Sequence, residues 1–220
     1  MISFLRNFLE PFSYLIYAVT LFLEIRMHSS FGKKVLFFYY VIATLIITYA
    51  CVIALDYDDN NNWIYNIHYF LSAGVFAYYF DAILVARKEK MFVRYLLVTT
   101  IIILLITDVI SYPFFNSAGN AFFFLLIVIC SFLYFNQLLV QRNEENILLN
   151  FNFWLVSGFV IYFLGSFFII LTYNYFTDKV TEEQKVLLGD LWSIQNILLL
   201  ISSAITLFGH LWIIYQKRLH

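Results

Sequence analysis

Seven long apolar stretches, separated by short polar segments, are the feature that most restricts how this chain can fold. They cover approximately residues 9–25, 35–55, 63–86, 92–112, 120–140, 150–174 and 188–215. A helix needs about 20 mostly apolar residues to cross a bilayer, whereas a membrane barrel shows alternating segments of about ten. Backbone polar groups in lipid must also be satisfied within each span. We therefore predict an all-α integral membrane protein, with residues 1–220 forming a single seven-transmembrane helix bundle.

The composition agrees with a chain that lies mostly in lipid. It is 63% hydrophobic and 12% charged, whereas soluble domains are about half apolar and about a quarter charged. The segments between the stretches are short, so we expect no soluble catalytic or ligand-binding domain. Cys51 and Cys130 lie inside apolar stretches. We interpret them as small interior residues, not as a disulfide or a redox pair.

Lysine and arginine are distributed unevenly between the polar segments. Ten of the 13 fall in the first, third and fifth connections and the C-terminal tail: Arg26, Lys33, Lys34, Arg87, Lys88, Lys90, Arg94, Arg142, Lys217 and Arg218. Only Arg6, Lys179 and Lys185 fall on the other side. The positive-inside rule then places the N-terminus outside and the C-terminus inside. We expect the membrane to be a bacterial cytoplasmic (inner) membrane.

Polar residues inside the stretches recur at helical spacing. Residues three and four apart share one helix face. On the last stretch such a stripe consists of Trp192, Asn196, Leu199, Ser203, Thr206 and His210. On the first stretch it consists of Glu10, Ser13, Tyr17, Thr20 and Glu24. We predict that these stripes face other helices and not lipid.

The third and sixth stretches carry similar faces. In the third the face consists of Asn66, Gly74, Ala77 and Asp81, and in the sixth of Gly158, Tyr162, Gly165 and Thr172. Small and hydroxyl residues at helix interfaces often serve packing alone. For these types packing is the leading interpretation, and ligand contact is the alternative. The prediction is that the first, third, sixth and seventh helices meet along these stripes.

Ionisable and amide side chains carry more information, because a charge near the bilayer centre costs about 2.5–3.5 kcal/mol on insertion scales. Sorted by depth, they form an outer and an inner group. The outer group is a predicted ligand-binding cup: Glu10, Asn66, His68, Asp108, Gln195 and Asn196. The inner group is a predicted polar cluster: Glu24, Asp81, Asn136 and His210. Glu10 and Glu24 lie near the two ends of the first stretch, where we expect both carboxylates to reach water.

Asp81 has several basic residues within reach. We expect it to be ionised and paired with Arg87, Lys88 or Arg94, or with His210 if the last helix adjoins the third. The alternative is a solvated charge at the rim of the bundle. Asp81→Asn would weaken the bundle in the first case and change little in the second.

The chain lacks the residues on which several seven-helix chemistries depend. The last stretch has no lysine for a retinal Schiff base, and the four histidines lie at different depths. No HExxH motif, membrane-protease motif or phosphate-binding glycine loop occurs. We therefore expect no enzyme, no catalytic residue, no cofactor and no metal site.

One resemblance rests on the sixth and seventh stretches. Residues 153–169, FWLVSGFVIYFLGSFFI, followed by IQNIL at 194–198, resemble a group of small bacterial seven-helix membrane proteins that accompany sensor histidine kinases. The resemblance implies a receptor-like sensor component without a soluble domain. It supplies no catalytic residues.

The leading functional hypothesis is a sensory or signal-relay module of the membrane. A small ligand would act on the outer cup, and a cytoplasmic or membrane partner would read the basic inner face. The first alternative is a small transporter or channel subunit that uses Asp81 and Asp108. Transporters often have helices interrupted by Gly or Pro, but Pro11 and Pro113 are expected at helix ends and Gly is scarce, with 7 in all. The second alternative is an accessory protein that scaffolds a partner. The bilayer is an expected partner in each case, and nucleic acid is not.

Overall fold

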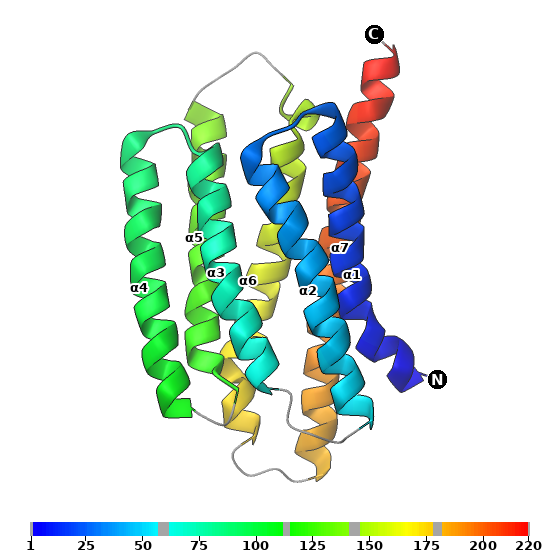
Figure 1. The fold of residues 1–220 in the computed structure, drawn as a ribbon, viewed down its shortest axis with the longest axis vertical. Coiled ribbons are helices and arrows are strands. Elements are labelled where there is room, and N and C mark those ends of the chain that lie inside the picture. Colours follow the sequence, from blue (N-terminus) through cyan, green and yellow to red (C-terminus); the bar gives the residue numbers. More distant parts are fainter. Residues whose placement is uncertain (1, 57–61, 112–114, 141–145, 178–181, 220) are drawn as a thin grey trace.

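The computed structural model describes residues 2–56, 62–111, 115–140, 146–177 and 182–219. Every regular element in these residues is a helix (Figure 1). The elements are α1 (Ile2–Met27), α2 (Phe31–Asp56), α3 (Asn62–Ile83), α4 (Arg87–Ser111), α5 (Ser117–Val140), η1 (Ile147–Leu149), α6 (Phe151–Thr177) and α7 (Glu182–Leu219). The all-helical fold predicted from the apolar stretches is confirmed.

Six of these helices are long and apolar enough to cross a membrane: α1, α2, α4, α5, α6 and α7. The protein is thus an all-helical membrane protein. α3 is not among these six, and the polar residues Asn62, Asn66 and His68 lie in its first two turns. It nevertheless runs beside α2 and α4 along the length of the bundle (Figure 1).

Six of the long helices form a closed ring, and the remaining one, α4, lies outside it. Around the ring the neighbours are α1, α2, α3, α5, α6 and α7, and α7 packs against α1 to close it. α4 packs on the outer side of α3 and α5. It buries only Val93, Thr100 and Leu104, so most of its surface is available to lipid.

Aromatic side chains fill the centre of the ring. Phe76 of α3 lies within 4.9–6.4 Å, centroid to centroid, of rings from three other helices: Tyr39, Tyr40, Phe123, Phe159 and Phe163. Most of these pairs are edge-to-face, the arrangement that the ring quadrupole favours. The bundle is therefore held by interlocking large rings in its middle layer.

The polar stripes of α1 and α7 face the interior as predicted. All five stripe residues of α1, and Asn196, Ser203, Thr206 and His210 of α7, are buried. α7 adjoins both α1 and α6, so three of the four helices expected to meet do so by direct packing. α3 lies across the ring and reaches α1 and α7 through the side chains of Tyr65, His68 and Tyr69.

The expectation that Pro11 marks a helix end is wrong. α1 begins at Ile2 and continues to Met27 with Pro11 inside it. Figure 1 shows that the N-terminal turns bend away from the bundle, as expected where proline removes a backbone hydrogen bond. Pro113 lies outside the described residues.

Candidate functional site

Glu10 belongs to a buried polar network inside the ring. Three other residues of the predicted outer cup, His68, Gln195 and Asn196, are buried there too. The Tyr65 hydroxyl donates to Glu10 Oε2 at 3.3 Å, and among the described residues Glu10 Oε1 has no hydrogen-bond partner. Glu10 is 1% exposed, so the expectation that it reaches water is wrong. The reason is that α1 begins two turns earlier than predicted, which places Glu10 inside the helix and not at its end.

His68 of α3 contacts residues of α1 and α2. Its Nε2 lies 3.2 Å from the Tyr14 hydroxyl and 3.4 Å from the Tyr39 hydroxyl. Tyr39 also bonds Ser72 Oγ at 2.6 Å, and Ser72 donates to the His68 carbonyl at 2.6 Å. This part of the network therefore ties α1 and α2 to α3.

Gln195 ties α7 to the same network. Its amide nitrogen donates to the hydroxyls of Tyr69 on α3 and Tyr162 on α6, each at 3.2 Å. Asn196, the next residue, is also buried. The sequence pattern did not predict that the tyrosines of this network would lie together. In a chain with 17 tyrosines, their spacing alone does not show which ones meet.

The six residues of the predicted outer cup occupy two separate places. Glu10, His68, Gln195 and Asn196 lie in the ring. Asn66 and Asp108 line a cavity of about 240 Å³ between α3 and α4, where Asn66 Oδ1 accepts from the Asn116 backbone and Asp108 is exposed. The cavity around His68 holds only about 10 Å³, which is room for about one water molecule.

The middle of the interior is a close contact between α1, α6 and α7. The Tyr17 hydroxyl bonds Ser202, and Ser202 donates to the Gly158 carbonyl. Gly158 allows this approach, because an added Cβ would lie 2.8 Å from the Ser202 carbonyl oxygen. Ser202 is one position away from the predicted stripe, which included Ser203. Both serines are buried.

A charged cluster lies at the opposite end of α1, where the basic connections gather. Glu24 Oε1 is 2.7 Å from Lys33 Nζ, and Glu24 Oε2 is 3.2 Å from His210 Nδ1. His28 Nδ1 lies 3.8 Å from Glu24 Oε1. Glu24 is 3% and His210 0% exposed, so the expectation that the Glu24 carboxylate reaches water is also wrong. The pair joins α1 and α7 at the end of the bundle where Lys33 lies.

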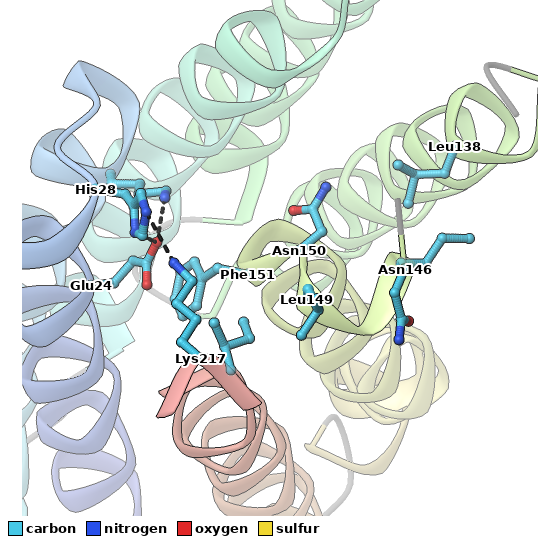
Figure 2. A pocket seen from close by; sticks show the side chains of 11 residues that line it. Glu24, His28, Leu138, Asn146, Leu149, Asn150, Phe151 and Lys217 are labelled. Atoms are coloured by element: carbon cyan, nitrogen blue, oxygen red, sulfur yellow. Dashed lines mark hydrogen bonds and ion pairs between the residues drawn. The ribbon is translucent and has the colours of Figure 1, made fainter. Parts of the chain in front are cut away.

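This cluster forms one wall of a cavity of about 440 Å³. Figure 2 shows Glu24, His28 and Lys217 together on one side and Asn146, Leu149 and Asn150 on the other. We call it the basic-end pocket; it is lined by Glu24, His28, Lys33, Leu138, Asn146, Ile147, Leu149, Asn150, Phe151, Ile213 and Lys217. The sequence contained two signals for it: the four-residue spacing of Glu24 and His28, and the positive-inside pattern, which puts Lys33 and Lys217 on one side.

The other two residues of the predicted inner cluster lie elsewhere. Asp81 pairs with Arg94 of α4 through two hydrogen bonds, of 2.8 and 3.0 Å. This confirms one of the partners expected for it, but the Arg94 side chain is 66% exposed. Asn136 is exposed on α5. Its neighbour Gln137 is the buried amide there; it accepts from Val85 N and donates to Ile83 O at the end of α3.

No protein-family model, curated protein or solved structure matches this chain. The resemblance to membrane proteins that accompany sensor histidine kinases therefore stays a prediction. Within the described ranges, no three His, Cys, Asp or Glu side chains gather as a possible metal site. The fold and the site together define a membrane helix bundle with a filled polar–aromatic centre and a charged pocket at its basic end.

Proposed function

We propose that the protein is a seven-span signal-relay module of the cytoplasmic membrane, with α3 as the seventh span. The alternation of the helices supports this, because α2 ends and α4 begins at opposite ends of the bundle (Figure 1). The basic residues of α4 and of the α1–α2 and C-terminal ends then lie on one side, inside the cell. A reporter fused to the C-terminus that is active only in the cytoplasm tests this orientation.

The observation that carries the proposal is the continuous polar face shared by α1 and α7. It begins at Glu10 and Gln195, each of which bonds a tyrosine of α3, passes through the Tyr17–Ser202 contact, and ends at the Glu24–His210 pair. A shift of α7 against α1 at one end changes the packing of buried polar groups at the other. Relay requires two states that an input stabilises differently, and the Glu24–His210 pair is the contact that such a shift would make or break.

The packing of the interior favours relay over solute transport. The cavity at the centre of the ring is about 10 Å³, and the two carboxylates expected along a transport path do not face it. Asp81 pairs with Arg94, and Asp108 is exposed on α4. A scaffolding role needs no buried link between the two ends, and so it leaves the polar face of α1 and α7 unexplained.

The experiment places a reporter at one end and a substitution at the other. An environment-sensitive fluorophore is attached to Ser29→Cys, which is exposed beside the basic-end pocket, while the native Cys51 and Cys130 are buried. Tyr65→Phe removes the hydroxyl that donates to Glu10. Relay predicts a shifted emission spectrum for Tyr65→Phe and an unshifted one for Tyr49→Phe, which lies on an exposed face of α2. Unchanged spectra in both variants would reject the relay.

A further inference from the structure

The basic-end pocket has an excess of cationic groups over carboxylates. Two lysines, Lys33 and Lys217, line it, and among the described lining residues Glu24 is the one carboxylate. We infer that this pocket binds the anionic phosphate group of a ligand. The inference does not depend on the relay, because it concerns the charges and donors of the pocket alone.

Lys217 is the residue that most clearly lacks an anion. Its Nζ lies 3.1 Å from His28 Nε2, and the described residues offer it no carboxylate within ion-pair distance. An ammonium group only donates, so His28 Nε2 is the acceptor in this contact. Lys33 is instead satisfied by Glu24. The pocket therefore keeps about one uncompensated positive charge beside a buried ion pair.

The opposite wall supplies an amide donor. Asn146 uses its side-chain oxygen to accept from Leu148 N at 3.0 Å, which leaves its amide nitrogen free to donate. α6 begins at Phe151 in the pocket wall, where Asn150 already accepts from the backbone N–H groups of Asn152 and Phe153. The two walls thus present an ammonium and an amide donor across one cavity.

Size and lining indicate a ligand larger than a simple ion. A cavity of about 440 Å³ lies in the range of small-molecule sites. Leu138, Ile147 and Ile213 make part of it apolar, so the phosphate would be attached to a carbon skeleton. Lysine binds phosphate as a point charge. Anionic phospholipid headgroups and soluble organic phosphates share this chemistry.

Two probes separate those sources. Radiolabelled inorganic phosphate is measured by equilibrium dialysis against the full chain in neutral detergent, with sodium chloride keeping the ionic strength constant. Dihexanoyl phosphatidylglycerol is measured by calorimetry, with dihexanoyl phosphatidylcholine, whose zwitterionic headgroup has no net charge, as the control. Binding of phosphate supports the inference with a soluble source. Binding of phosphatidylglycerol but not phosphatidylcholine supports it with a lipid source.

Matched lysine and arginine variants locate the site. Lys217→Ala removes the uncompensated ammonium, and we expect about tenfold weaker binding of whichever probe binds, the loss of roughly one charged hydrogen bond. Arg218→Ala and Lys34→Ala remove neighbouring cations that do not line the pocket, and binding should stay within about twofold. If neither probe binds wild type, or if Lys217→Ala and Arg218→Ala weaken binding equally, the inference is overturned.

Discussion

The centre of the ring and the basic-end pocket are built largely from the same helices, but they use those helices in opposite ways. At the centre, α1 and α6 contribute Tyr17 and Phe159, whose ring centroids are 6.1 Å apart, and the remaining space is about 10 Å³. At the pocket, α1 and α7 contribute Glu24 and Lys217 to a cavity of about 440 Å³. Ionisable groups cost most at the membrane centre. That cost explains why hydroxyls and rings occupy the middle and charges the end.

Glu10 is the exception that this comparison exposes. It is as buried as the central tyrosines, yet one of its oxygens has no hydrogen-bond partner in the part of the chain that the structure describes. Buried polar groups are normally satisfied, and those left unpaired are often found where function requires them. Its place at the start of the face shared by α1 and α7 is the reason that the proposed relay begins there.

The largest expected loss of stability comes from a substitution at the centre of the ring. Phe76→Ala removes a ring that contacts five others, and the cavity left behind should cost about 3–5 kcal/mol of unfolding free energy. Phe168→Ala removes a ring that is 65% exposed and should cost far less. Denaturant unfolding in detergent micelles, followed by circular dichroism, measures both. Equal losses would mean that the centre is not closely packed.

A smaller effect is expected where α6 meets α7. Gly158→Ala places a Cβ 2.8 Å from the Ser202 carbonyl oxygen, which forces the helices apart at a cost of about 1–3 kcal/mol. Gly74→Ala is the matched control, because an added Cβ there meets nothing within 4 Å. The same unfolding measurement should show a loss for Gly158→Ala only. A stable Gly158→Ala variant would contradict the close contact.

The two charged pairs, Glu24–His210 and Asp81–Arg94, are expected to differ in how much they stabilise the protein. Glu24→Gln leaves Lys33 and the buried His210 without a carboxylate, and we expect a loss of about 1–2 kcal/mol. Asp81→Asn breaks a pair whose Arg94 partner is mostly exposed, where solvent screens the interaction, so stability should change little. Thermal unfolding of the two variants beside wild type tests this. A larger loss in Asp81→Asn would reverse the ranking of the two sites.

Helix positions and buried faces followed from the sequence because both depend on local spacing. The stripes on α1 and α7 were predicted from residues three and four apart, and all of their members are buried except Trp192, which is half-buried. The Asp81–Arg94 pair was also within reach of such reasoning, since the two residues flank one short connection. Which helices adjoin around the ring depends on packing between distant segments, and a single sequence does not encode that in any local pattern.

The site was harder to predict for the same reason. Depth along each stretch grouped Asn66 and Asp108 with Glu10, but α4 lies outside the ring and carries Asp108 with it. His28, Lys33 and Lys217 looked like separate loop charges. They converge because α1 and α7 are neighbours and both end at the basic end.

The central claim is that the interior is closed and that the basic-end pocket is open on the side that we propose faces the cytoplasm. Two variants each carry one added cysteine: Ser72→Cys, buried beside His68, and Asn146→Cys, in the pocket wall. Both are treated with a membrane-impermeant maleimide. Wild type is the blank, since Cys51 and Cys130 are buried, and protein unfolded in SDS gives full labelling. We predict that Asn146→Cys is labelled only when the reagent is admitted to the cytoplasmic side, and that Ser72→Cys is labelled from neither side. Labelling of Ser72→Cys in the folded protein, or of Asn146→Cys from outside the cell, would contradict this account.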